Sequence, residues 1–200
     1  FHQILIGFSA VGLLVFIALF FVKAGYGMFR TAQWGFSLPN KIGWLLMEAP
    51  VFFVMLILWL QSGKSVSSVP FLFFLLFELH YFQRSFVFPF LMKGKSKMPV
   101  AIMLMGVVFN LLNGYIQGEW LFFLAPEDLY SSAYLCRINC WIGIIVFFLG
   151  MGINWHSDYV IRHLRQPGDT KHYLPEKGMY HWVTSGNYFG ELLELSLIHI

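Results

Sequence analysis

The amino-acid sequence predicts an all-α fold, a polytopic transmembrane helical bundle. Of its 200 residues, 58% are hydrophobic and only 12% are charged, whereas charged residues make up about a quarter of an ordinary soluble domain. The apolar residues are gathered into stretches long enough to cross a hydrocarbon layer of about 30 Å. None of these stretches alternates between apolar and polar residues as a strand does, so we expect helices throughout.

Six apolar stretches have the length of a transmembrane helix, which is about 17–25 residues. They are roughly Ile4–Val22, Ile42–Leu60, Pro70–Met92, Pro99–Gln117, Tyr134–Asn154 and Met179–Leu197. No repeat and no low-complexity linker separates them, so we expect a single domain. Gly186 and Gly190 in the last stretch form a small-x-x-x-small pair, which we expect to pack against another helix.

The charges of the connecting loops alternate along the chain. The fourth loop is acidic, with Glu119, Glu127 and Asp128, and the second carries only Lys64, whereas the first, third and fifth loops are basic. The basic residues are Lys23, Arg30 and Lys41, then Lys93, Lys95 and Lys97, and finally Arg162, Arg165, Lys171 and Lys177. Because basic loops stay in the cytoplasm, we expect these three loops there and the N-terminus outside.

Polar residues within spans are candidate functional residues, because an ionisable group there costs about 2.5–3.5 kcal/mol on insertion scales. At about 1.5 Å of helix rise per residue, Glu48 lies about 10 Å from the predicted cytoplasmic end of its span. Arg84 and Tyr81 lie about 14 and 18 Å from the predicted cytoplasmic end of theirs. Asn187 and Glu191 lie about 12 and 18 Å deep and share one helix face. These depths predict a polar cavity in the cytoplasmic half of the bundle.

The fifth span ends in a polar face whose members are spaced three or four residues apart. They are Asn154, Asp158, Arg162 and Arg165. Simpler interpretations remain open for several of these groups. Asp158 and Arg162 can form an i,i+4 ion pair on a helix end, and Arg84 can pair with Glu191 for purely structural reasons.

Other polar residues are expected to lie outside the site. Asn113 and Gln117 are expected to form hydrogen bonds between helices. His80 and His156 stand in polar surroundings but lack the spacing of a metal site, so no metal is expected. The sequence contains no G-x-G-x-x-G, P-loop or H-E-x-x-H motif, which excludes a nucleotide-binding fold of the soluble type.

Five segments follow one another between residues 38 and 194. They are Leu38-Pro39 with Trp44–Pro50, His80–Gly94, Asn113–Gln117, Gly152–Tyr159 with Leu164–Asp169, and Gly186–Glu191. They resemble the LP…W-x-x-Q-E-x-P, HY-x-x-R, NGYLQ, INIHSD…LR-K-PGD and NYFGE motifs of the steroid 5α-reductase family. Each motif alone is weak, but five in the order of the family make a specific resemblance.

The resemblance implies an NADPH-dependent enzyme that reduces the 4,5 double bond of a 3-oxo-Δ4-steroid by hydride transfer to carbon 5. Glu48 and Tyr81 match the pair that hydrogen-bonds the 3-oxo group. The implied cofactor-binding positions are Arg84, Asn154, His156, Asp158, Arg165, Asn187 and Glu191. Arginines suit the phosphates because a guanidinium presents a fixed fork of donors. We expect a preference for NADPH over NADH, because the extra phosphate of NADPH binds further cationic donors.

The sequence departs from the family pattern at several points. Met47 replaces the Gln that usually stands beside the catalytic Glu, and Phe88 stands where a Tyr can occur. The match ends at Glu194, where the family continues with Trp and a seventh span. We therefore expect six of seven spans, an incomplete domain over residues 1–194, a non-native tail over 195–200, and a fragment that need not be active by itself.

The resemblance also implies the setting: a monomeric membrane enzyme with no nucleic-acid partner. We expect it in the endoplasmic reticulum of a eukaryote or the inner membrane of a bacterium, with its site facing the cytoplasm. A related reductase of an enoyl thioester or a polyprenol remains open, as do a membrane methyltransferase and a transporter. A transporter is less favoured, because the outer half of the bundle is apolar apart from Asn110, Asn113 and Gln117.

Overall fold

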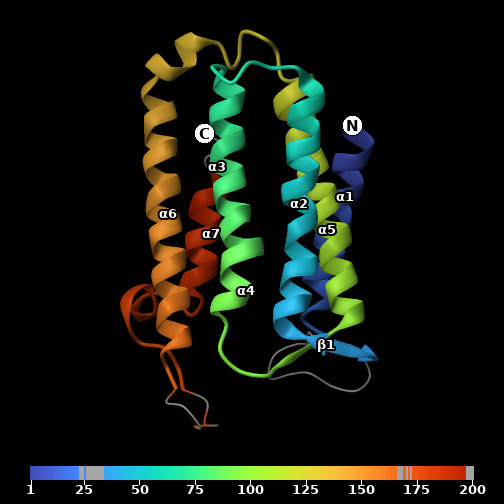
Figure 1. Ribbon diagram of the computed structural model, residues 1–200, viewed down its shortest axis with the longest axis vertical. Helices are drawn as coiled ribbons and strands as arrows, with labels where there is room; N and C mark the ends of the chain where they lie inside the picture. The colour runs from blue at the N-terminus through green and yellow to red at the C-terminus, as the bar shows by residue number, and fades with distance from the viewer. Residues whose placement is uncertain (23–24, 26–33, 166–168, 170, 172, 197–200) are drawn as a thin grey trace. The chain divides into compact units, whose positions relative to one another are not determined.

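The computed structural model is mostly helical (Figure 1) and describes residues 1–22, 25, 34–165, 169, 171 and 173–196. Lys23 and Arg30 of the first loop, residues 166–168 of the fourth matching segment and residues 197–200 of the tail lie outside the described residues. The chain divides into two compact units, Phe1–Tyr130 and Ser131–Ile200. We describe each unit by itself, and the expectation of a single domain stays a prediction.

The first unit contains α1 (His2–Ala18), α2 (Asn40–Ser62), α3 (Val69–Phe82) and α5 (Val100–Glu119) as its main helices. α3 continues through a π-helical segment, η3 (Gln83–Val87), into α4 (Phe88–Leu91), and α5 continues into a second one, η4 (Trp120–Leu124). Pro89 has no N–H to donate to the carbonyl of Ser85, which gives a physical reason for the interrupted α pattern at η3.

Local signals in the sequence set the ends of α2 and α3. Gly63 follows α2 with a φ of 64°, a left-handed conformation that favours glycine as a helix stop. Ser68 caps α3, since its hydroxyl accepts the N–H of Phe71 at 3.4 Å, and Pro70 stands in the first turn, where its missing N–H costs nothing.

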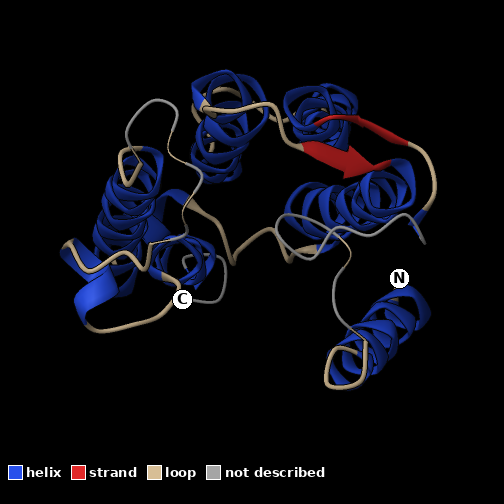
Figure 2. Ribbon diagram, turned by 90° about the horizontal axis from the view of Figure 1, so that it is seen from below, coloured by secondary structure: helices blue, strands red, loops and turns tan. Residues whose placement is uncertain are grey.

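Two short strands, which the sequence analysis did not expect, join the starts of α2 and α5. β1 (Ser37–Pro39) pairs antiparallel with β2 (Lys97–Pro99), with Leu38 opposite Met98 (Figure 2). Both of these residues precede a proline, which disfavours the helical conformation and favours an extended one. Since β1 leads into α2 and β2 into α5, the first and third loops meet at one end of the unit (Figure 1).

A ridge of small residues on α5 allows it to approach α2 closely. A Cβ added at Gly114 would lie 3.2 Å from Val51, and one at Gly118 would lie 2.6 Å from Leu58. At Gly106, an added Cβ would overlap the side chain of Met47. These glycines are spaced in multiples of four, and the remaining position of the ridge is Asn110. The ridge therefore points Asn110 at α2.

The second unit is built on α6 (Ile138–Arg162), preceded by the short helix η5 (Ser132–Cys136). After α6 come η6 (Gly178–His181) and α7 (Gly186–Ser196), which packs beside α6. A Cβ at Gly190 would lie 2.5 Å from the backbone nitrogen of Asn154 and 2.6 Å from the carbonyl oxygen of Gly150. The prediction that Gly190 packs against another helix is confirmed.

Among the residues that the structure describes, four helices are long and apolar enough to cross a membrane by length and composition. They are Asn40–Ser62, Val69–Leu91, Val100–Leu124 and Ile138–Arg162. These correspond to the second to fifth predicted spans, while α1 is a shorter apolar helix that ends at Ala18 rather than Val22. The structure thus supports a polytopic helical bundle, but the described residues do not contain six such spans.

The sixth predicted span, Met179–Leu197, is wrong as a continuous helix. The chain forms η6 first, leaves helical structure, and re-enters it at Gly186. Thr184, Ser185 and Gly186 are the reason, because Ser, Thr and Gly favour helix starts over helix interiors. The 11 residues of α7 span only about 16 Å at 1.5 Å per residue, about half of a hydrocarbon layer.

We predict that Gly190→Ala lowers the melting temperature of the detergent-solubilised protein. The added methyl group meets backbone atoms of α6, which cannot move aside cheaply, so a cost of about 1–3 kcal/mol is expected. Gly152→Ala is the matched control, since nothing lies within 4 Å of its added Cβ. An unchanged melting temperature for Gly190→Ala would contradict this packing.

Candidate active site

Glu48 and Tyr81 belong to a buried polar group in the first unit, the α2–α3–α5 cluster. The group consists of Glu48, Tyr81, Asn110 and Asn113. Glu48 of α2 is 9% exposed and Tyr81 of α3 is 6% exposed. Nδ2 of Asn110 donates to Oε2 of Glu48 at 3.0 Å and to the carbonyl oxygen of Met47 at 2.8 Å. Nδ2 of Asn113 lies 2.8 Å from the hydroxyl oxygen of Tyr81 and donates to it.

Asn113 does form a hydrogen bond between helices, as predicted, but its partner is a candidate catalytic residue. Asn110 contacts the other candidate. Asn113 was predicted to lie outside the site, and Asn110 was predicted only as a polar residue of the outer half, because depth along each span was the criterion. Depth along one helix does not say which neighbouring helix a side chain faces, so the two contacts were missed.

The ring of Tyr81 lies in the apolar core of the first unit. Its centroid is 4.6 Å from that of Phe77 and 4.8 Å from that of His80. The other buried members of this core are Val51 and Met55 of α2, Phe74 of α3, and Leu121 and Phe122 of η4. Packing on these sides fixes the ring, so the hydroxyl group is held at the polar edge where Asn113 meets it.

Arg84 lies in η3, among aromatic rings of the first unit. Its guanidinium carbon is 4.6 Å from the ring centroid of Trp44 and 4.7 Å from that of Phe88, and the two rings meet edge to face. Cation–π contacts of this kind stabilise a buried cation. Phe88, where the family can have Tyr, supplies one of the two ring faces. A role of Arg84 in cofactor binding stays a prediction.

Glu78, one turn before Tyr81 on α3, was not predicted as a candidate site residue. Glu78 is buried, and neither of its carboxyl oxygens has a hydrogen-bonding partner among the residues that the structure describes. The rule that selected Glu48, an acidic residue within a predicted span, applies equally to Glu78. A buried polar group without a partner costs stability.

A second group in the second unit, the α6–α7 cluster, contains most of the implied cofactor positions. Its members are Asn154, Asp158, Tyr180, Asn187 and Glu191. Nδ2 of Asn154 donates to the carbonyl oxygen of Asn187 at 3.1 Å and to Oε1 of Glu191 at 3.2 Å. Asn154 and Asp158 are buried on α6. Asn187 and Glu191 both accept from Asn154, as expected if the two residues share one face of the helix.

Tyr180 of η6 was not singled out from the sequence. Its hydroxyl donates to Oδ1 of Asn187 at 3.3 Å. Burial, and then the nearby carboxylate of Asp158, raise the pKa of Tyr180 to about 12. The group therefore stays protonated at neutral pH and remains a hydrogen-bond donor.

His156 and Arg165 lie apart from this buried group. Both are exposed, and the ring of His156 stands beside Gly178, where an added Cβ would overlap it. Arg165 follows α6, and its charge helps to lower the pKa of Asp169, after larger effects from hydrogen bonds donated by the Lys171 N–H and the Tyr173 hydroxyl. Arg165 is thus a solvent-accessible cation beyond the end of α6.

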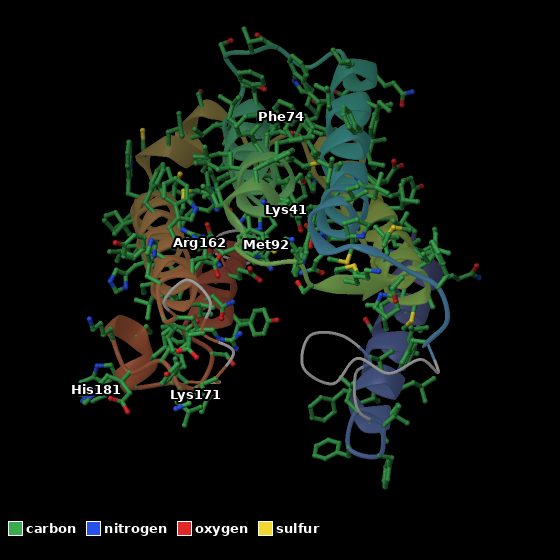
Figure 3. The ribbon with its side chains drawn as sticks, turned by 60° about the horizontal axis from the view of Figure 1, so that its bottom comes forward. Lys41, Phe74, Met92, Arg162, Lys171 and His181 are labelled. Atoms are coloured by element: carbon green, nitrogen blue, oxygen red, sulfur yellow. The ribbon has the colours of Figure 1, made fainter. Side chains whose placement is uncertain are left out.

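The end of the first unit that carries β1 and β2 is basic. Lys41, Lys93, Lys95 and Lys97 are all exposed there. Lys41, near Met92 in Figure 3, donates to the carbonyl oxygen of Phe90 at 3.5 Å. α5 and η4 run from this end to the acidic loop with Glu127 and Asp128. The two ends of the unit therefore differ in charge as the sequence predicted.

Comparison with known proteins shows one consistent similarity. Residues 96–198 match the model of the family described as 3-oxo-5-alpha-steroid 4-dehydrogenase. The chain is 32% identical over 189 residues to 3-oxo-5-alpha-steroid 4-dehydrogenase 1 of Bos taurus, covering 92% of this chain and 72% of the relative. It is 34% identical to 3-oxo-5-alpha-steroid 4-dehydrogenase 2 of Homo sapiens, covering 96% and 75%. It is 30% identical to Steroid 5-alpha-reductase DET2 of Gossypium hirsutum, covering 97% and 76%.

We predict that Glu78→Leu stabilises the protein. Leu has a similar volume and removes a buried carboxyl whose oxygens have no hydrogen-bonding partner among the described residues, so a gain of about 1–3 kcal/mol is expected. The melting temperature in detergent should rise. Glu127→Leu, at an exposed loop position, is the control and should change stability by less than about 0.5 kcal/mol. A lower melting temperature for Glu78→Leu would mean that its carboxyl has a stabilising partner.

Proposed function

We propose that this chain, which belongs to the 3-oxo-5-alpha-steroid 4-dehydrogenase family of oxidoreductases, reduces the 4,5 double bond of a 3-oxo-Δ4-steroid to the 5α-steroid with NADPH. The observation that carries the proposal is the α2–α3–α5 cluster. There, two groups able to donate hydrogen bonds, Glu48 and Tyr81, are buried within largely apolar helices and held by amides of a third helix.

Glu48 and Tyr81 act on the 3-oxo group of the substrate. Addition of hydride to carbon 5 moves the electrons of the double bond toward the ketone oxygen, and carbon 4 then takes up a proton. Tyr81 through its hydroxyl, and Glu48 through a protonated carboxyl, donate hydrogen bonds to that oxygen as negative charge develops on it. Donors fixed in advance at such a position typically accelerate a reaction by about 10²–10³ each.

The α6–α7 cluster provides suitable groups for the cofactor. NADPH, when bound, supplies the hydride. Nδ2 of Asn187 offers a donor, and the carboxylates of Asp158 and Glu191 offer acceptors for ribose hydroxyls or a carboxamide. Asn154 and Tyr180, whose own donors already reach Asn187 and Glu191, hold these groups in place. Arg165 offers its guanidinium fork to a phosphate and so favours NADPH over NADH. This combination of groups fits a dinucleotide and needs no metal.

The setting follows from hydropathy and charge. The protein is an integral membrane protein with a lipophilic substrate, placed in the endoplasmic reticulum if its source is eukaryotic. The basic end of the first unit, with Lys93 and Lys97, faces the cytoplasm. Glu48 is seven residues from Lys41 along α2, which is about 10 Å from that end. The reaction therefore takes place in the cytoplasmic half of the membrane, in a monomer without a nucleic-acid partner.

We predict that Glu48→Leu and Tyr81→Phe each lower turnover by about 10²–10³ and leave the KM for NADPH near its normal value. Glu48→Gln should keep partial activity, because an amide still donates. The assay measures 5α-steroid formed by membranes containing the complete protein with saturating NADPH. Glu119→Gln, a carboxyl-to-amide change at the far end of α5, is the control. Native turnover of correctly inserted Glu48→Leu would remove Glu48 from the mechanism.

We predict that Arg165→Ala raises the KM for NADPH more than the KM for the steroid, because it removes phosphate donors and no carbonyl donor. Arg137→Ala is the matched control, since Arg137 is also exposed but flanks the other end of α6. Competition with NADH should become more effective in Arg165→Ala. Equal weakening of both substrates would contradict the assignment of Arg165 to the cofactor.

A further inference from the structure

We infer that Asn110 and Asn113 of α5 are positioning residues for the proposed reaction: they orient the donor groups of Glu48 and Tyr81 toward the substrate oxygen. The inference rests on the proposed function, because it assigns a task to residues that contact the catalytic pair rather than the substrate. Neither asparagine was expected from the sequence to belong to the site.

The two asparagines are three residues apart on one helix, so they are neighbours on its surface. From there they contact different helices: Asn110 contacts Glu48 on α2, and Asn113 contacts Tyr81 on α3. Asn110 is 4% exposed and occupies the position between Gly106 and Gly114 in the glycine ridge that brings α5 against α2. One rigid helix thus holds both members of the pair.

The contacts of Asn110 fix the orientation of its amide. The carbonyl oxygen of Met47 can only accept, so the Asn110 atom 2.8 Å away is the NH₂ nitrogen. The same nitrogen lies 3.0 Å from Oε2 of Glu48, and Oε2 must therefore accept. In a neutral carboxyl the carbonyl oxygen is the better acceptor, so the contact favours the proton on Oε1 and makes Oε1 the donating atom of Glu48.

Asn113 orients the donor group of Tyr81, as Asn110 orients that of Glu48. Its amide donates to the hydroxyl oxygen, so this bond uses a lone pair of Tyr81 and leaves the hydroxyl proton for another acceptor. A hydroxyl that accepts a hydrogen bond also becomes a stronger donor, because successive hydrogen bonds polarise one another. Both asparagines consequently favour the donor state that stabilises a developing oxyanion.

The test exchanges each amide for a carboxyl of the same shape in the complete protein. Asn110→Asp and Asn113→Asp replace a donor by an acceptor and should lower kcat by about 10–100-fold, as for the outer partners that orient metal ligands, with the KM for NADPH unchanged. Gln117→Glu makes the same amide-to-carboxyl exchange one turn further along α5 and should leave kcat unchanged. Native kcat in both Asp variants would overturn the inference.

Double variants separate positioning from packing. Asn113→Asp should not lower kcat further in Tyr81→Phe, which has no hydroxyl to orient, but should still lower kcat in Glu48→Leu. Asn110→Asp should not lower kcat further in Glu48→Leu but should still lower it in Tyr81→Phe. Losses that multiply in every background would overturn this inference alone. Native turnover in Tyr81→Phe and Glu48→Leu would instead overturn the catalytic pair itself and, with it, the inference.

A second pair of variants covers the case in which the Asp variants fail to insert. Asn113→Ser keeps a donor, whereas Asn113→Ala has none. Asn110→Ser and Asn110→Ala provide the same comparison for the contact with Glu48 of α2. We expect each Ser variant to retain more turnover than the corresponding Ala variant at matched protein level. Equal turnover within both pairs would overturn the inference.

Discussion

A polar group buried among apolar helices in a membrane is stabilised only by partners inside the protein, because no water is available to it in the hydrocarbon layer. Both units meet this constraint in a similar way. A close approach of two helices at glycines brings an asparagine amide to a glutamate on the neighbouring helix. In the first unit Asn110 contacts Glu48, and in the second Asn154 contacts Glu191.

The candidate chemistry depends on these amide contacts. The carbonyl-binding pair needs two donors held in fixed orientations, and the α2–α5 approach provides the amide that reaches Glu48. Met47 stands where the family usually has Gln, yet an amide still contacts Glu48, supplied by Asn110 from the facing helix. Binding a dinucleotide needs a mixture of hydrogen-bond donors and acceptors, and η6 adds the hydroxyl of Tyr180 to the polar side chains of α6 and α7.

Hydropathy and helical spacing predicted the parts of the molecule that depend on one helix at a time. They identified four long apolar helices, with ends shifted by a few residues, and the shared face of Asn187 and Glu191. They failed where the result depends on two helices or on local backbone preference. The sixth span was wrong because an average over 19 residues hides the break at Thr184–Gly186. Asn113 was set aside because its depth along one helix does not reveal that its partner on the neighbouring helix is Tyr81.

Isotope labelling shows whether the hydride of NADPH is transferred to carbon 5 of the steroid. Membranes containing the complete protein are incubated with a 3-oxo-Δ4-steroid and NADPH that carries deuterium at the transferable position of its nicotinamide ring. The product is analysed by mass spectrometry and NMR. The account predicts a 5α-steroid with one deuterium at carbon 5 and a solvent-derived hydrogen at carbon 4. Absence of conversion, or a product without deuterium at carbon 5, would contradict it.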